Sequence, residues 1–205
     1  MNNKREPLLI VVSAPSGSGK TTIVRRLVEM IPEMKRSVSY ATRQIRDGEK
    51  DKDDYIFIKK EEFFEKRRNG EFLESEENFG NYYATSRKKI EEILEQGNDV
   101  ILSLDIKGAR TVRRLFPSSI SIFIMPPSVK ELETRLKKRN TDHEEQVSLR
   151  LKEAEAEISA ADEFDYLVVN EDLQKAVEEI MVIVKKERAT RRRKGPDKNE
   201  KNFTR

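Results

Sequence analysis

The chain has 205 residues, of which 41 are Lys or Arg and 38 are Asp or Glu, with one His and neither Cys nor Trp. That length suits one domain with inserted subdomains, and the absence of cysteine excludes a disulfide framework and a cysteine-ligated metal site. No apolar run approaches the about 20 residues that cross a bilayer, so we expect a cytoplasmic protein with no membrane partner.

The net charge of +3 is unevenly distributed. Residues 191–205 carry seven basic and two acidic side chains, a charge of +5, which leaves residues 1–190 at about −2. Such a tail can bind a nucleic-acid backbone non-specifically, but its composition is more typical of a solvated, disordered terminus. We therefore expect no specific nucleic-acid partner.

Short apolar runs alternate with helical patterns along most of the chain. The runs are rich in β-branched residues and lack polar alternation, which is typical of parallel strands buried on both faces. Alternating strands and helices predict an α/β fold with a three-layer parallel sheet. The patterns predict strands at 8–13, 100–104, 120–125 and 166–169, and helices at 21–30, 86–96 and 173–189.

Two segments depart from this alternation. Residues 37–85 are polar and rich in Tyr, Phe and acidic residues, which predicts a small mixed α+β insertion. Residues 128–160 are charged and mostly helical, with few apolar residues. That pattern suits either a mobile flap over a site or a solvated pair of surface helices.

A Gly/Ser-rich turn joins the first strand to the first helix. It matches the P-loop pattern except that Ala14 stands at the first glycine position. Gly17 and Gly19 let backbone N–H groups face an anion at the helix N-terminus. Lys20 then supplies a charge to the β- and γ-phosphates, and Thr21 offers a hydroxyl to Mg²⁺. A turn that binds nothing is the alternative, but the context favours a nucleoside triphosphate at Ala14, Pro15, Ser16, Gly17, Ser18, Gly19, Lys20, Thr21 and Thr22.

Arg43 and Arg46 lie three residues apart in the insertion, with a tyrosine nearby. Guanidinium groups offer planar, bidentate donors to a phosphate monoester. In a chain with 39% charged residues, exposed arginines are usually only solvated. The pair by itself leaves both interpretations open.

Together the motifs resemble the guanylate kinase family, over about residues 8–190. Besides the P-loop, the resemblance rests on Ser37-x-Ser39, Thr42-Arg43-x-x-Arg46-x-Gly48-Glu49, Asp54-Tyr55-x-Phe57, Gly80-Asn81-Tyr82-Tyr83, Leu104-Asp105-Ile106-Lys107-Gly108-Ala109, Arg135-Leu136-x-x-Arg139-x-Thr141-Asp142 and Phe164-Asp165-Tyr166 with Asn170-Glu171-Asp172-Leu173. It implies a P-loop kinase core at 8–36, 97–127 and 161–190, a GMP-binding insertion with its connecting helix at 37–96, a helical lid at 128–160, and a basic disordered tail at 191–205.

The resemblance further implies Mg²⁺-dependent, direct in-line transfer of a phosphoryl group from ATP to GMP, and to dGMP. It assigns the GMP phosphate to Arg43, Arg46, Tyr55 and Tyr83, and the guanine to Ser39, Glu74 and Thr85. This makes chemical sense because one carboxylate can accept both N1–H and N2–H of guanine. Adenine, with an acceptor at N1, would leave that carboxylate unpaired.

The remaining implied roles lie between the two nucleotides. Asp105 faces the GMP and metal region, where it can contact Mg²⁺ through water. With Lys20, three lid arginines neutralise charge on the transferred group: Arg135, Arg139 and Arg150. Ser103 stands where the family commonly has an acid, and Ala41, Gln44 and Ile45 replace Thr, Pro and Pro.

Two alternatives to this activity stay open. The first is a guanylate-kinase-like interaction module that transfers no phosphate, and the second is a kinase of a different monophosphate. The residues matched to guanine favour GMP over other acceptors. The sequence does not address oligomeric state.

Overall fold

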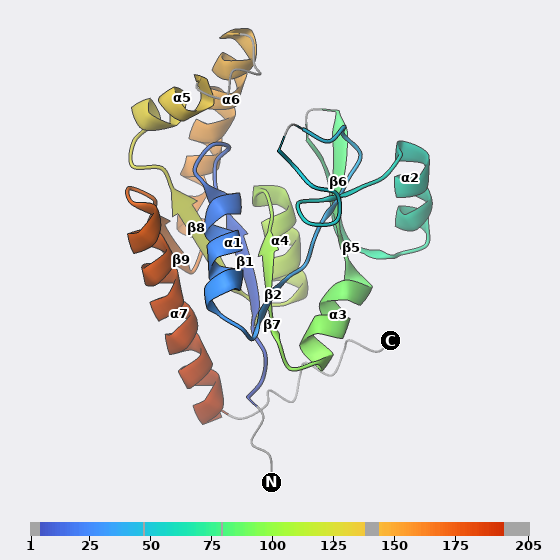
Figure 1. Cartoon of the computed structure of the whole chain (residues 1–205), viewed down its shortest axis with the longest axis vertical. Helices are drawn as coiled ribbons and strands as arrows, with labels where there is room; N and C mark the ends of the chain where they lie inside the picture. The colour runs from blue at the N-terminus through green and yellow to red at the C-terminus, as the bar shows by residue number, and fades with distance from the viewer. Residues whose placement is uncertain (1–4, 47, 79, 138–143, 195–205) are drawn as a thin grey trace.

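The computed structural model describes residues 5–46, 48–78, 80–137 and 144–194, with their side chains except at 135–137, 144–150 and 192–194. A five-stranded sheet with strand order β2-β7-β1-β8-β9 forms the centre of the molecule, and all its neighbouring strands are parallel. Helices cover both faces of this sheet (Figure 1). The predicted three-layer α/β fold is therefore confirmed.

Four strands of this sheet lie within one residue of their predicted limits, because each is a short apolar run. The prediction of burial on both faces is wrong for β9, whose Leu167 and Val169 are exposed because this strand lies at the edge of the sheet. They are β1 (Leu9–Ser13), β7 (Asp99–Ser103), β8 (Ile120–Met125) and β9 (Tyr166–Val169). The fifth, β2 (Met34–Arg36), was not predicted, since its three residues include two basic ones.

The two faces of the sheet have separate cores. Ile10 and Val12 of β1 pack with α1 (Lys20–Met30) and α7 (Leu173–Lys194), whereas Leu9 and Val11 pack with α3 (Arg87–Glu95) and α4 (Ile106–Leu115). This alternation follows from the period of two residues in a strand. Because β1 is buried on both faces, it holds the turn after it rigidly.

The insertion contains its own four-stranded sheet, with strand order β4-β3-β6-β5. Its core is aromatic, and Phe63 of α2 is fully buried against rings that include Phe72 and Tyr82. The elements of the insertion are β3 (Tyr40–Ala41), β4 (Ile56–Phe57), α2 (Lys60–Arg68), β5 (Phe72–Asn78) and β6 (Asn81–Ser86). Ser86 caps α3, which leads the chain back to the main sheet.

The lid segment forms α5 (Val129–Lys137), α6 (Glu144–Ser159) and a short 3-10 turn, η1 (Ala161–Glu163). Leu132 and Ala154 are buried against each other with Leu151 beside them, so the two helices have a small core of their own. The helix pair stands above the P-loop end of the main sheet (Figure 1).

The prediction that a disordered tail begins at residue 191 is wrong in its boundary. Helix α7 continues to Lys194, and the Arg191 side chain donates a hydrogen bond to the Ser118 carbonyl. The helix extends because charged residues are good helix formers, whereas Gly195-Pro196 follows as a stop signal. Residues 195–205 lie outside the described part of the chain. In that part, no helix has both the length and the apolar character needed to cross a bilayer.

Candidate active site

The P-loop follows β1 at the edge where the parallel strands have their carboxyl ends. Gly17 and Gly19 adopt left-handed backbone angles, with φ of 90° and 87°, which side-chain-bearing residues rarely adopt. Asn170, which follows β9 directly and is 6% exposed, donates from Nδ2 to the Ser18 carbonyl at 2.7 Å. The loop is therefore held by β1, which precedes it, and by Asn170 from the C-terminal part of the chain.

Lys20 begins α1 and points toward the end of β7. Its Nζ donates to the Leu104 carbonyl at 2.6 Å, and the hydroxyl of Ser13 donates to the same oxygen at 3.0 Å. Burial lowers the pKa of Lys20, and the charges of Asp105 and Glu157 oppose that shift. The ammonium group thus lies between the phosphate-binding turn and two carboxylates.

Asp105 joins the main sheet to the insertion. It is the N-cap of α4, where its Oδ1 accepts from the Gly108 N–H at 2.8 Å. Its Oδ2 accepts from Nδ2 of Asn78 in β5 at 2.5 Å. The carboxylate predicted to face the GMP and metal region therefore also holds the insertion against α4.

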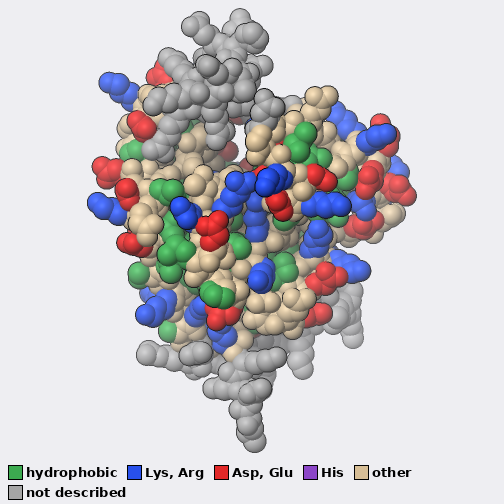
Figure 2. Space-filling model, viewed as in Figure 1, with side chains coloured by type: hydrophobic (Ala, Val, Ile, Leu, Met, Phe, Trp, Pro, Cys, Tyr) green, Lys and Arg blue, Asp and Glu red, His purple; other side chains and the backbone are tan. Residues whose placement is uncertain are grey.

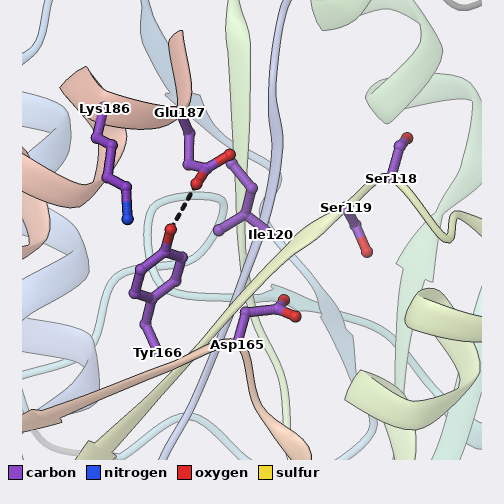
Figure 3. A pocket seen from close by; sticks show the side chains of 7 residues that line it. All are labelled: Ser118, Ser119, Ile120, Asp165, Tyr166, Lys186 and Glu187. Atoms are coloured by element: carbon purple, nitrogen blue, oxygen red, sulfur yellow. Dashed lines mark hydrogen bonds between the residues drawn. The ribbon is translucent and has the colours of Figure 1, made fainter. Parts of the chain in front are cut away.

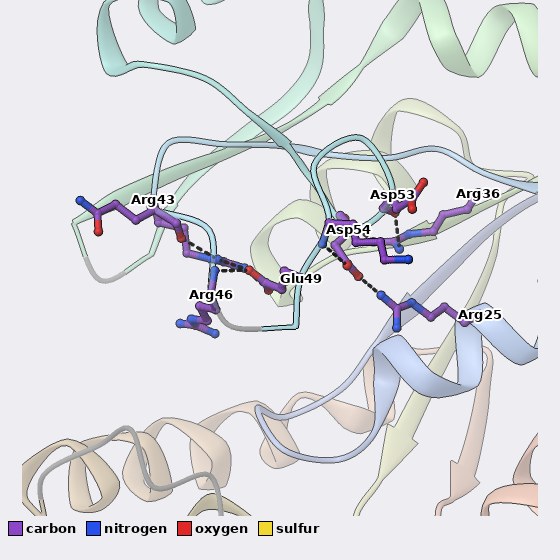
Figure 4. Close-up of polar contacts among 9 residues, drawn as sticks. Arg25, Arg36, Arg43, Arg46, Glu49, Asp53 and Asp54 are labelled. Carbon is purple, nitrogen blue, oxygen red and sulfur yellow. Dashed lines mark hydrogen bonds and ion pairs between the residues drawn. The ribbon is translucent and has the colours of Figure 1, made fainter.

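The predicted phosphate clamp is partly assembled. Arg43 forms a bidentate pair with Glu49, with both N–O distances at 2.6 Å, and its guanidinium lies 4.9 Å from the ring centre of Tyr55. Tyr55 and Tyr83 contact each other with ring centres 5.8 Å apart. The hydrogen bond from Arg43 lowers the pKa of Glu49. Arg46 donates only its backbone N–H to Glu49, and its side chain is exposed (Figure 4).

The three residues matched to guanine lie in one row across the insertion sheet. Glu74 of β5 pairs directly with Thr85 of β6, and the register of β3 on β6 places Ser39 opposite Thr85. Thr85 donates from Oγ1 to Oε1 of Glu74 at 2.5 Å. Burial raises the pKa of Glu74 to about 7, with a further contribution from Asp105. The row thus combines two hydroxyls with a carboxyl that titrates near neutrality.

A second set of contacts, not predicted from the sequence, ties the insertion to the main sheet. Asp54, 3% exposed, pairs with Arg25 of α1 and accepts from the Lys50 N–H at 3.0 Å. Arg36 of β2 donates to the carbonyls of Asp53 at 3.2 Å and Asp54 at 2.7 Å (Figure 4). In the space-filling view, a group of Lys and Arg side chains lies where α1 meets the insertion (Figure 2).

The lid contributes a carboxylate that was also not predicted. Glu157 of α6 lies near the Ser16 backbone N–H in the P-loop, which favours the charged carboxylate and partly opposes the effect of burial. Burial raises the pKa of Glu157 to about 7, which the charge of Lys20 opposes and that of Asp105 reinforces. Its i, i+4 neighbour Glu153 is a sequence signal for an acidic face, but the P-loop contact depends on how α6 packs. Of the predicted lid arginines, Arg139 and the side chains of Arg135 and Arg150 lie outside the described residues.

The oxygen ligands near the P-loop suit a magnesium ion that binds together with a nucleotide. They suit a metal ion bound by the protein alone less well. Thr21 is exposed in the first turn of α1, as a hydroxyl ligand must be, whereas both Asp105 oxygens already accept hydrogen bonds. Among the described residues, no group of three or more His, Asp or Glu side chains could hold a metal. Such a site suits Mg²⁺ that keeps waters and phosphate oxygens as its other ligands.

A pocket of about 460 Å³ lies elsewhere, at the amino ends of β8 and β9 (Figure 3). Tyr166 donates to Glu187 across it at 2.5 Å. Ligands of open α/β sheets bind at the carboxyl ends of the strands, so this pocket is separate from the P-loop site. Its lining consists of Ser118, Ser119, Ile120, Asp165, Tyr166, Lys186 and Glu187.

Comparisons with known sequences agree with this geometry. A family profile described as guanylate kinase matches residues 6–187. The chain is 46% identical over 177 residues to a guanylate kinase of Chlorobium luteolum, covering 86% of this chain and 90% of the relative. It is 48% identical over 182 residues to a guanylate kinase of Aliivibrio fischeri, covering 88% of each.

Solved structures give the same result. The guanylate kinase from Anaplasma phagocytophilum superposes with a TM-score of 0.77 at 36% identity, covering 90% of this chain and 88% of that one. A gluconokinase from Sinorhizobium meliloti superposes with a TM-score of 0.50 at 18% identity, covering 91% of this chain and 96% of that one. The second likeness concerns the fold alone.

Proposed function

Because this chain belongs to the guanylate kinase family, we propose that ATP binds at the P-loop and GMP at the insertion, with Lys20 and Asp105 between them. The activity is that of a nucleoside monophosphate kinase, which converts ATP and GMP to ADP and GDP.

The observation that carries this proposal is a continuous set of contacts between the two nucleotide sites. Lys20 bonds to the Leu104 carbonyl, and the next residue, Asp105, bonds to Gly108. Gly108 in turn lies against the Glu74 carboxylate. The segment from the end of β7 to the first turn of α4 therefore contacts both Lys20 of the P-loop and Glu74, the carboxylate proposed to bind guanine.

At the ATP site, the P-loop N–H groups and the α1 N-terminus bind the phosphates. Lys20 contacts the β- and γ-phosphates and leaves its hydrogen bond with Leu104 to do so. Thr21 holds Mg²⁺, with Asp105 contacting it through water. When bound, Mg²⁺ neutralises charge on the triphosphate.

At the GMP site, the phosphate binds Arg43, Arg46 and the hydroxyls of Tyr55 and Tyr83. The bidentate pair with Glu49 fixes the position of the Arg43 guanidinium. Glu74 accepts N1–H and N2–H of guanine, Ser39 donates to O6 of the base, and Thr85 positions Glu74 through the hydrogen bond between them. The buried position of Glu74 supports a role in specificity, because an unpaired carboxylate there disfavours the wrong base.

Transfer needs no general base in this arrangement. A phosphate oxygen of GMP attacks the γ-phosphorus, and the bond from that phosphorus to the β–γ bridging oxygen breaks, releasing ADP. Since the GMP phosphate is already anionic, positioning and charge neutralisation account for the catalysis. Lys20 supplies part of that neutralisation, and the resemblance assigns the rest to Arg135, Arg139 and Arg150.

An acceptor panel of GMP, dGMP, AMP, CMP and UMP, assayed as ATP turnover with Mg²⁺ or with EDTA, tests this proposal. We expect GMP and dGMP to be used, the other acceptors to be rejected, and EDTA to stop turnover. Lys20→Ala and Arg43→Ala should abolish turnover. Arg26→Ala is a matched control, because Arg26 lies on the same helix, is exposed, and pairs with the exposed Glu29.

Near-normal activity of Lys20→Ala or Arg43→Ala would contradict the site assignment. A preference for AMP or UMP would contradict the reading of guanine by Glu74. Nucleotide binding without turnover on any acceptor would instead support an interaction module.

A further inference from the structure

Gly108 lies in the first turn of α4, where its backbone needs no glycine. Its φ is not in the left-handed region, so any residue could adopt this conformation. Glycine is also among the poorest helix formers. We therefore looked for a neighbour that a side chain at this position would contact too closely.

That neighbour is the carboxylate of Glu74. A Cβ added to Gly108 would lie 3.0 Å from Oε2 of Glu74 and 3.4 Å from its Cδ. The same Cβ would lie 3.4 Å from Oδ1 of Asp105. Since real Cβ contacts are rarely this close, either the carboxylate or the helix would have to move.

Glu74 has little freedom to move away. Its Oε1 accepts from Thr85 at 2.5 Å, and the residue is 7% exposed. An irregularity in the β5–β6 register between Phe72 and Glu74 accompanies the burial of both Leu73 and Glu74, although neighbouring strand residues normally face opposite sides. The carboxylate is confined between the Thr85 hydroxyl and the Gly108 backbone.

Helix α4 is equally constrained on its side. Asp105 caps its first turn and accepts from Asn78 of β5, so the helix end and the strand move together. Ile106, Ala109 and Val112 anchor the helix in the core. A methyl group at position 108 would therefore act mainly on Glu74.

We propose that Gly108 is a positioning residue for acceptor specificity, because its missing side chain leaves the place that the Glu74 carboxylate occupies. This inference rests on the proposed reading of guanine by Glu74. It predicts that a single methyl group at position 108 impairs recognition of GMP without impairing the ATP site or the fold.

The test compares Gly108→Ala with wild type. We expect the KM for GMP to rise by about tenfold, the ratio of GMP to AMP turnover to fall, and the KM for ATP to change less than about twofold. The thermal unfolding midpoint should change little, because the better helix propensity of alanine offsets the strain at Glu74. Lys107→Ala is the control, since Lys107 is exposed in the same turn. An equal rise in the KM for ATP and the KM for GMP, or no rise in the KM for GMP, would overturn the proposal.

A double-mutant cycle separates this inference from the proposed function. In a Glu74→Ala background, Gly108→Ala should cause no further loss of GMP binding by calorimetry. A further tenfold loss there would show that the methyl group acts elsewhere and would overturn the inference. If Glu74→Ala itself leaves GMP binding unchanged, the proposed reading of guanine fails. If only Gly108→Ala has no effect, the inference alone fails.

A folding defect in Gly108→Ala would also be informative. Glu74→Asp shortens the acid by one methylene and removes the contact. Recovery of folding in Glu74→Asp/Gly108→Ala would support the proposed contact, and failure to recover would overturn it.

Discussion

Glu157, near the end of lid helix α6, lies close enough to the Ser16 N–H of the P-loop for this amide to favour its charged form. Amides of this loop bind phosphate in P-loop kinases, so the carboxylate and the triphosphate compete for the same part of the site. Because burial raises the pKa of Glu157 to about 7, its charge changes near neutral pH.

We predict that Glu157→Gln lowers the KM for ATP at pH 8 by about three- to tenfold, a loss of repulsion of about 1 kcal/mol. Below pH 6 the wild-type carboxyl is protonated, so the two proteins should have the same KM. ATP kinetics between pH 6 and 8.5 measure this. Glu155→Gln, an exposed acid on the same helix, is the control. Identical pH profiles for wild type and Glu157→Gln would contradict the competition.

Glu74 should give GMP the opposite pH dependence. Its pKa of about 7 means that the carboxyl is protonated below pH 7 and accepts two guanine N–H donors only when ionised. We predict that the KM for GMP falls as pH rises from 6.5 to 8.5. Glu74→Gln should raise that KM on the order of 100-fold and remove the part of the pH dependence that the GMP phosphate does not cause. A wild-type profile parallel to that of Glu74→Gln would exclude the ionisation of Glu74 as its cause.

The same residue should destabilise the free protein at alkaline pH. Its folded pKa lies above the ordinary value of 4.5, so the native state binds the extra proton between pH 4.5 and 7. Stability is therefore lost as pH rises through that window. We predict that Glu74→Gln gains stability over wild type as pH rises, on the order of 3 kcal/mol by pH 8. Urea unfolding at pH 4.5, 6 and 8 measures the difference, which should be absent at pH 4.5.

The elements that the sequence predicted best are those whose stability is local. The strand before the P-loop is an uninterrupted apolar run, and the glycines and Lys20 of the loop are all adjacent in the sequence. Strand β2 and helix α4 were missed because Met34–Arg36 is mostly charged and Gly108 interrupts a helical pattern. Both are stabilised by packing on the main sheet rather than by their own propensity.

The contacts between segments could not be predicted in the same way. Glu49 belongs to a recognised motif, but its pairing with Arg43 follows from the turn between them. The contacts of Asp54 with α1 and of Glu157 with the P-loop join residues far apart in the sequence. Such pairs depend on how the insertion and the lid pack against the main sheet, and local sequence patterns do not predict that packing.

The buried Asp54 next to Tyr55 should affect GMP more than ATP. We predict that Asp54→Ala lowers the free energy of unfolding by about 1–3 kcal/mol, because the Lys50 N–H and Arg25 lose their partner. The KM for GMP should rise about tenfold, with the KM for ATP nearly unchanged.

Arg25→Ala, the partner variant, should lower the free energy of unfolding by about 1 kcal/mol or less, since the Arg25 side chain is 50% exposed. Urea unfolding and initial rates measure both effects. An equal rise in the KM for ATP and the KM for GMP in Asp54→Ala would contradict the larger effect expected on GMP.

Asn170 should affect ATP and leave GMP unchanged. Its Nδ2 bonds to the Ser18 carbonyl and lies 2.5 Å from the position a Cβ would take at Gly19, so it fixes the loop on its inner side. We predict that Asn170→Ala leaves that buried carbonyl unpaired, costs about 1–3 kcal/mol of stability, and raises the KM for ATP about tenfold. Glu171→Ala, an exposed neighbour, should change neither value. Calorimetric titrations with ATP and GMP separate the two sites. The Asn170 side chain bonds to the P-loop, so a matching loss of GMP affinity would mean that it supports the whole sheet edge rather than the loop.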